Sequence, residues 1–238
     1  SEMCIRDSSW YPETEFCYIT DNKGNFLAAK GGYNDESHNH NDAGTFSFWI
    51  DQTPFLIDAG VGTYTRQTFS KDRYTIWTMQ SNYHNLPLIN GVPQKHGATY
   101  KATQVQADKR KNTFTANIAT AYPAEAEVES WIRSYSLQKG QLRISDSFRL
   151  TTAKQPNQIN FMTWGQVNTE IPGKIQLEVK GKKAFIEYDK QLFDVKTETI
   201  PLTDPRLSNV WGKSIYRITL TATNIYKTGN YSFIIKKQ

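Results

Sequence analysis

From residue 98 to the C-terminus, the chain alternates short strand-like segments with polar turns, and this repetition most restricts its fold. Segments rich in Thr, Val, Ile and aromatic residues are separated by turns such as residues 109–112 and Gln138-Lys139-Gly140. Many short strands at close spacing predict an all-β fold, a large antiparallel β-sandwich (super-β-sandwich) with few short helical turns. We expect strands at residues 98–108, 112–119, 127–137, 141–150, 158–164, 174–179, 184–188, 192–198, 215–222 and 231–235.

The first hundred residues are less regular. Residues 15–20 and 25–30 flank an Asp-Asn-Lys-Gly turn and predict a hairpin. Strands are also expected at 45–51, 55–58 and 86–90, whereas 63–84 reads as a short helix or an ordered loop. No composition break divides the chain, so residues 10–238 are predicted to form one domain. Residues 1–9 fit no pattern that follows and are expected to be a non-native or disordered extension.

Charge and composition exclude several classes of partner. The net charge is +5, with Lys and Arg scattered along the chain, which favours an anionic substrate over a nucleic-acid groove. No apolar run approaches the roughly 20 residues that span a bilayer. The two cysteines, Cys4 and Cys17, could pair, but a chain of this size does not need a disulfide.

A histidine-containing loop precedes the strand expected at 45–51. It reads Ser37-His38-Asn39-His40-Asn41-Asp42-Ala43-Gly44. In extended backbone His38 and His40 project to one side, and neutral imidazole is the commonest metal ligand. A polar surface loop is the alternative, because Asn, Asp and Gly are also turn residues.

Two further residues extend this candidate site. Asp58 ends an apolar segment, where a carboxylate is costly unless it is paired, bound to a metal or capping a turn. His84 lies just before the strand at 86–90, a boundary like that of the first histidine pair. Two histidines and one aspartate suit zinc (Zn2+), so four candidates compete for about three ligand positions. His96 lies on an expected turn and is read as structural.

Other enzyme motifs fit poorly. A cupin signature would need a Glu separated from His40 by three or four residues, where Gly44 and Thr45 stand. The chain also has no Gly-x-Ser-x-Gly nucleophile elbow, no P-loop and no dinucleotide-binding fingerprint.

Three motifs in order resemble the C-terminal β-sandwich module of heparinase II/III-type polysaccharide lyases. They are residues 37–44, Leu56-Ile57-Asp58-Ala59-Gly60, and Tyr83-His84-Asn85 followed by Leu88-Ile89-Asn90-Gly91. The resemblance runs from about Phe16 to the C-terminus and is strongest over residues 28–95. It implies that His40, Asp58 and His84 are zinc ligands, that His38 faces the substrate, and that Tyr64 lines the active cleft.

The resemblance also implies an activity. It is β-elimination on an anionic uronic-acid polysaccharide, in a periplasmic or secreted bacterial enzyme, with heparin-type glycans and alginate both open as substrates. In the family an N-terminal α-helical module carries a tyrosine that acts as the principal acid/base group. This chain lacks that module, so little or no turnover is expected of it alone.

A carbohydrate-binding or structural sandwich without catalysis is the competing interpretation. Exposed aromatic side chains could stack on sugar rings, although most aromatic residues of an all-β chain are in the core. The candidates are Tyr33, Trp49, Tyr64 and Trp77.

Overall fold

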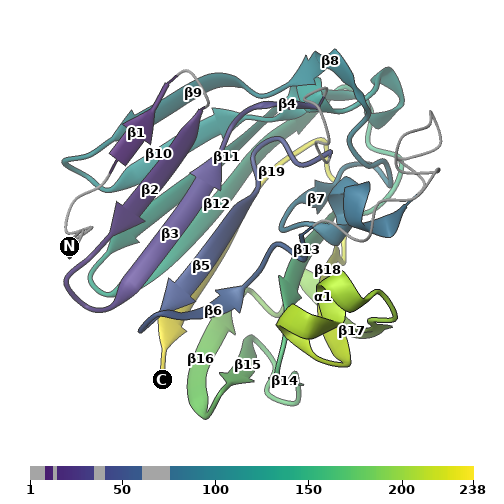
Figure 1. Ribbon diagram of the computed structural model, residues 1–238. Coiled ribbons are helices and arrows are strands. Elements are labelled where there is room, and N and C mark those ends of the chain that lie inside the picture. Colours follow the sequence, from purple (N-terminus) through teal and green to yellow (C-terminus); the bar gives the residue numbers. More distant parts are fainter. Residues whose placement is uncertain (1–8, 13–14, 35–40, 61–75) are drawn as a thin grey trace.

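Two antiparallel sheets lie face to face in the computed structural model, which describes residues 9–12, 15–34, 41–60 and 76–238 (Figure 1). The first sheet has the strand order β1-β2-β3-β5-β6. Its strands are β1 (Ser9–Tyr11), β2 (Phe16–Thr20), β3 (Asn25–Lys30), β5 (Phe46–Ile50) and β6 (Thr53–Leu56).

The larger sheet behind it has eight strands in the order β14-β15-β16-β19-β12-β11-β10-β9. They are β9 (Thr103–Asp108), β10 (Thr113–Asn117), β11 (Val128–Gln138), β12 (Gln141–Leu150), β14 (Gln166–Asn168), β15 (Lys174–Val179), β16 (Lys182–Glu187) and β19 (Thr228–Lys237). Its centre is the hairpin β11–β12, in which Leu137 pairs with Leu142 across the predicted Lys139-Gly140 turn.

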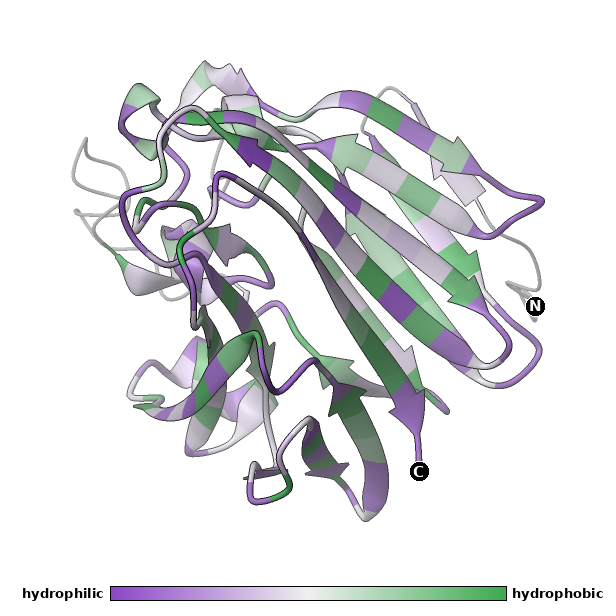
Figure 2. Cartoon of the chain, turned by 180° about the vertical axis from the view of Figure 1, so that it is seen from behind, coloured by the Kyte–Doolittle hydropathy of each residue, from purple (hydrophilic) through white to green (hydrophobic). Residues whose placement is uncertain are grey.

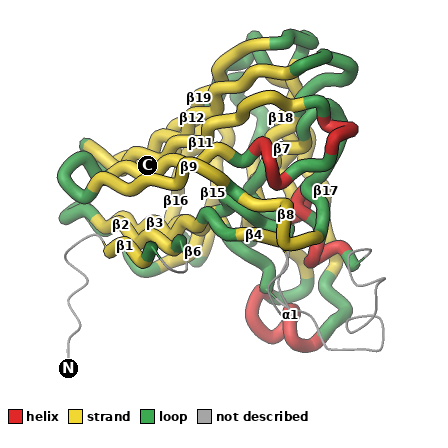
Figure 3. The backbone as a smooth tube through the Cα atoms, turned by 90° about the horizontal axis from the view of Figure 1, so that it is seen from above, coloured by secondary structure: helices red, strands yellow, loops and turns green. Residues whose placement is uncertain are grey.

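A four-stranded sheet, β17-β18-β13-β7, lies beside the first sheet, as the view from above shows (Figure 3). Its strands are β7 (Pro87–Leu88), β13 (Gln158–Thr163), β17 (Phe193–Pro201) and β18 (Ser214–Ala222). A short two-stranded sheet joins β4 (Tyr33–Asn34) to β8 (Gly97–Lys101). The helical elements are α1 (Pro205–Trp211) and the 3₁₀ turns Trp77–Met79, Ser81–Tyr83, Ala119–Ala121 and Ala124–Ala126.

Alternation of side chains places the core between the sheets. Along β12 every second residue is buried, and the stripes of Figure 2 show the same alternation on the neighbouring strands. Phe46 on β5 packs against Tyr135 on β11 and against Phe161 on β13, with ring centroids 5.0 and 6.3 Å apart. The three large sheets therefore share one hydrophobic core.

A buried ion pair lies in this core, on two neighbouring strands of the eight-stranded sheet. Arg133 and Asp146 face each other on β11 and β12, both fully buried, with Arg133 Nε 2.8 Å from Asp146 Oδ1 and Nη2 2.8 Å from Oδ2. Trp131 Nε1 donates to the same carboxylate. Burial lowers the pKa of the Arg133 guanidinium, but Asp146 and Tyr135 raise it more, so the net direction is upward.

A second, smaller apolar cluster lies under α1. It contains Ile57, Met162, Leu207 and Ile215, and Trp211 donates from Nε1 to the Ala59 carbonyl at 2.9 Å. This cluster fixes the chain directly after β6, on the side of the molecule that carries the candidate site.

The predicted fold class is confirmed, and the differences are local. The expected 98–108 strand divides at Ala102, whose N–H donates to the Gly32 carbonyl. The expected 86–90 strand shortens to β7, and helix α1 and strand β14 were not predicted. Ser9 lies in β1, whereas residues 1–8 are outside the described part of the chain. Among the described residues, no helix has the length and apolar character that crossing a membrane requires.

Candidate metal centre

Asp58 lies where the chain leaves β6. The Ile57 N–H donates to the Met162 carbonyl at 2.9 Å, which continues the contact with β13 by one residue beyond the strand. The Asp58 side chain is 40% exposed, and its Oδ1 accepts from the Gly60 N–H at 2.9 Å. The carboxylate therefore does cap the following turn, as the structural interpretation predicted.

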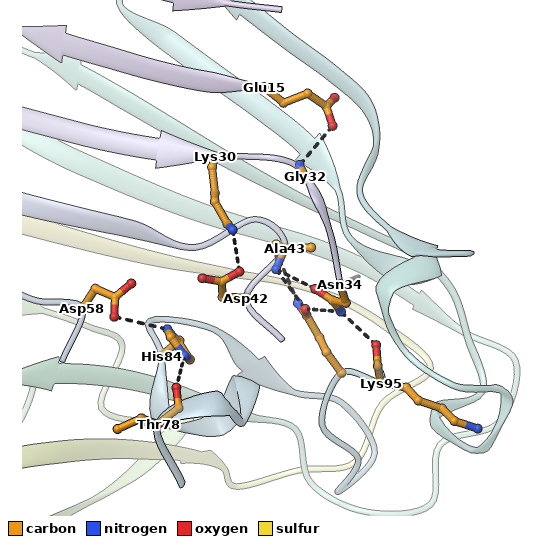
Figure 4. A network of polar contacts seen from close by, with 11 residues as sticks. Glu15, Lys30, Gly32, Asn34, Asp42, Ala43, Asp58, Thr78, His84 and Lys95 are labelled. Carbon is orange, nitrogen blue, oxygen red and sulfur yellow. Dashed lines mark hydrogen bonds and ion pairs between the residues drawn. The ribbon is translucent and has the colours of Figure 1, made fainter. Parts of the chain in front are cut away.

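His84 follows the 3₁₀ turn Ser81–Tyr83 and is 2% exposed. Its Nε2 lies 2.9 Å from the Thr78 carbonyl oxygen, and its Nδ1 lies 3.9 Å from Asp58 Oδ1 (Figure 4). Because a carbonyl only accepts, we assign the proton of a neutral ring to Nε2, which leaves a lone pair on Nδ1. A ring held to a backbone carbonyl in this way presents its other nitrogen as metal-binding histidines do.

Asp42 is the third member of the cluster. One ligand atom from each of Asp42, Asp58 and His84 lies within 4.8 Å of the other two. Asp42 and Lys30 are nearly buried, with 2.5 Å between Lys30 Nζ and Asp42 Oδ1 (Figure 4). Two carboxylates and an imidazole are thus held together beside one ammonium group.

The spacing of these atoms fits a small divalent cation. Two ligand atoms on a tetrahedral zinc, each about 2.0–2.2 Å from the metal, are roughly 3.3–3.6 Å apart. The distance of 3.9 Å between His84 Nδ1 and Asp58 Oδ1 is too long for a hydrogen bond and close to this bridging distance. A metal held here would neutralise the two carboxylates and fix the surrounding loops.

The other predicted site residues are placed as follows. His38, His40 and Tyr64 lie outside the described residues. Asp58 and His84 come together, and their roles stay predictions. His96 is exposed and outside the cluster, and its Nδ1 lies 2.7 Å from the Asn34 carbonyl oxygen.

Sequence reasoning missed Asp42, Asn85 and Gln94. Asp42 continues the two-residue spacing of His38 and His40, so its position was a usable signal. Asn85 and Gln94 are buried amides that bond to the backbone around the cluster. Asn85 lies in the third motif, but neither residue type indicated this role.

The comparisons with known proteins identify the family. A family model described as "Heparinase II/III-like, C-terminal" matches residues 5–203. No curated protein matches the chain. A crystal structure of the heparan sulfate lyase HepC from Pedobacter heparinus has a TM-score of 0.75 at 16% identity, covering 100% of this chain and 37% of that chain.

Two further structures agree on the fold. A heparinase III gene product has a TM-score of 0.73 at 13% identity, covering 98% of this chain and 36% of that chain. A chondroitin AC lyase mutant from Streptomyces coelicolor has a TM-score of 0.53 at 8% identity, covering 97% of this chain and 32% of that chain. The chain therefore spans about a third of the length of these structures, and by its match to the family model it belongs to the heparinase II/III-like family, in the C-terminal region of that family.

Proposed function

We propose that this chain is the β-sandwich part of a polysaccharide lyase that cleaves an anionic, uronic-acid-containing polysaccharide by β-elimination. The observation that carries the proposal is the Asp42–Asp58–His84 cluster, which is built from the segments before β5, after β6 and before β7 in a chain of the heparinase II/III-like family. The net charge of +5 suits a polyanionic substrate. Such a substrate places the enzyme in the periplasm or outside the cell.

In the proposed site, His40, Asp58 and His84 would hold one zinc ion, and a carboxylate oxygen of Asp42 lies within 4.8 Å of the ligand atoms of Asp58 and His84. When bound, the metal supplies positive charge that offsets the carboxylates and joins three loops. The Thr78 carbonyl keeps the His84 ring oriented, and the Gly60 N–H fixes one oxygen of Asp58. We therefore propose that the metal supports the structure of the site and takes no direct part in the reaction.

The reaction needs three functions besides binding. The substrate carboxylate must be neutralised, a base must take the proton from the adjacent carbon, and an acid must protonate the leaving glycosidic oxygen. The C–H electron pair becomes the new C=C bond as the C–O bond breaks. We assign neutralisation or proton transfer to His38 and a cleft position to Tyr64. We propose that an N-terminal helical module supplies the principal acid/base tyrosine, so that turnover needs both that module and the β-sandwich described here.

Metal analysis and activity together test the proposal. Purified protein should contain about one zinc per chain, and Asp58→Asn and His84→Ala should each lose it. His96→Ala is the matched control, because His96 is exposed and outside the cluster. Co-expression with a helical module should restore formation of unsaturated uronate, and His38→Ala should abolish it. Wild-type protein without zinc, or zinc that survives His84→Ala, would contradict the metal assignment.

A second candidate function is carbohydrate binding by the outward face of the five-stranded sheet. Tyr18 and Phe26 stack with ring centroids 6.0 Å apart, and Phe26 meets Trp49 edge-on at 5.2 Å. Tyr11 and Phe16, both exposed, extend the row. Trp77 instead packs on Tyr83, and the side chains of Tyr33 and Tyr64 lie outside the described part.

This aromatic row has the chemistry of a sugar platform. Phe26 and Trp49 line a cavity of about 480 Å³ whose rim includes Asp21, Asn25 and Gln52. Aromatic faces contact the C–H faces of sugars, while a polar rim bonds to hydroxyls. Glycan binding that Trp49→Ala removes and His84→Ala leaves intact would favour this second function.

A further inference from the structure

Asn85 connects three segments of the candidate metal centre. Its side chain is 1% exposed. Nδ2 donates to the Phe46 carbonyl at 2.8 Å and to the Ile57 carbonyl at 3.2 Å, and Oδ1 accepts from the Met162 N–H at 2.6 Å. One buried amide therefore binds backbone groups at the start of β5, just after β6 and within β13.

The bonds of Asn85 reach the residues next to the cluster. Ile57 precedes Asp58, and Asn85 itself follows His84. The Asn85 carbonyl in turn accepts from Arg133 Nη1, and Arg133 is held by Asp146 in the centre of the eight-stranded sheet. Through its side chain and its backbone carbonyl, Asn85 thus connects the segments of Asp58 and His84 to a fully buried ion pair.

The side chain of Gln94 holds the backbone next to Asp42 in a similar way. Its Oε1 accepts from the Ala43 N–H and from Asn34 Nδ2, both at 3.0 Å, and its Nε2 donates to the Ala43 carbonyl at 2.8 Å. Both backbone groups of the residue after Asp42 are therefore bound by one buried amide, in the network that Figure 4 shows around Ala43 and Asn34. Gln94 is itself fixed by its N–H, which donates to Ser81 Oγ at 2.8 Å.

We propose that Asn85 and Gln94 are positioning residues that hold Asp42, Asp58 and His84 at metal-binding distance. The inference rests on the proposed metal site and adds the residues that create its geometry. Outer partners of metal ligands typically change metal affinity about 10–100-fold when they are replaced. Neither amide lies among the three clustered ligand groups, so their effect is transmitted through the backbone at Ala43, Ile57 and His84.

Asn90 provides a matched control. It is also buried, its Nδ2 donates to the carbonyls of Ala126 and Thr152 at 2.8 and 2.7 Å, and its Oδ1 accepts from the Lys154 N–H. It therefore bridges two carbonyls as Asn85 does, but none of its partners adjoins the cluster. Asn85→Asp and Asn90→Asp each remove both donors with almost no change in volume.

The experiment measures zinc affinity by chelator competition on folded protein, with the visible spectrum of the cobalt-loaded protein as a second readout. Asn85→Asp should weaken zinc binding about 10–100-fold and alter the cobalt spectrum, while Asn90→Asp loses comparable thermal stability but keeps both metal properties. Gln94→Glu keeps the acceptor and loses the donor to the Ala43 carbonyl, so it should show the same loss of zinc affinity as Asn85→Asp. If Asn85→Asp does not fold, Gln94→Glu tests the positioning role in its place.

Unchanged zinc affinity in Asn85→Asp and Gln94→Glu, or an equal loss in Asn90→Asp, would overturn the inference. Wild-type protein that binds no zinc would overturn the metal proposal instead. Crystal structures of the variants then decide the positioning role. Displacement of Asp58 and His84 in Asn85→Asp but not in Asn90→Asp supports it, and unmoved side chains refute it.

Discussion

Arg133 binds Asp146 through two parallel hydrogen bonds and, with its third nitrogen, binds the backbone carbonyl of Asn85. Both charged side chains are fully buried. A single guanidinium therefore joins the central hairpin of the large sheet to the segment that carries His84. A bidentate pair with an additional carbonyl acceptor uses the planar fork of arginine in a way that lysine cannot reproduce.

Asp146→Asn should destabilise the protein by about 3–5 kcal/mol, because it leaves the Arg133 charge buried without its counterion. Urea unfolding followed by tryptophan fluorescence measures the loss. The double variant Arg133→Met with Asp146→Leu removes both charges and should recover much of it. A double variant no more stable than Asp146→Asn would show that the pair matters for reasons other than charge burial.

Lys30→Met should lower the free energy of unfolding by about 2 kcal/mol in metal-free protein, between the values typical of exposed and buried pairs. The change leaves Asp42 next to Asp58 without the ammonium that balances them. Saturating zinc should stabilise Lys30→Met more than wild type, because the metal then supplies that charge.

Lys154→Met is the control for this prediction, since the side chains of Lys154 and Glu127 are 54% and 31% exposed, against 11% and 8% for Lys30 and Asp42. Thermal unfolding with EDTA and with zinc compares all three proteins. Equal stabilisation of Lys30→Met and wild type by zinc would show that Lys30 does not balance the negative charge of the cluster.

Gly44→Ala should cost more stability than Gly181→Ala, although both glycines have positive φ, +87° and +77°. A Cβ at Gly44 would lie 2.5 Å from Ile118 Cγ2, whereas nothing lies within 4 Å of one at Gly181. We expect about 1 kcal/mol for the conformational cost at Gly181 and about 2–4 kcal/mol at Gly44, where a clash is added. Equal losses in chemical denaturation would mean that Ile118 moves aside.

Cys17 should react slowly with thiol reagents in the native protein. Burial raises the pKa of its thiol to about 11, against a smaller opposite effect of Lys109. At pH 8 only about 0.1% of the thiol is then ionised, and the thiolate is the reactive form. In a Cys4→Ser variant, a chromogenic disulfide reagent should release one equivalent in urea and almost none before unfolding. Rapid native labelling would contradict the burial of Cys17.

The strands were predictable where alternation and turns coincide. The hairpins at residues 16–30 and 128–150 follow the predicted bounds closely, because polar turns with glycine interrupt clear two-residue patterns. Helix α1 was missed although Asp204-Pro205 is a helix start, with Asp204 Oδ1 accepting from the Arg206 N–H. Only seven residues follow that signal, too few for a helical period to show against the surrounding strands.

The candidate site was predictable in part. Asp58 and His84 were singled out because each stands at a strand boundary, and the structure brings them together. Asn85 and Gln94 could not be singled out, since their partners are carbonyls and N–H groups of residues distant in sequence. A side chain that bonds to backbone leaves no complementary residue type in the sequence to signal it.

The dependence of the cluster on Met162 and Arg133 has a consequence for biosynthesis. A ribosome has already delivered residues 42, 58 and 84 long before it delivers the strand and the arginine that lock Asn85 in place. The nascent polypeptide therefore carries Asp42, Asp58 and His84 before the hydrogen bonds that hold them together can form. Pairing between strands that are distant in sequence is slow. If the proposed metal site binds a cation, binding should therefore come late in maturation, after β13 has docked.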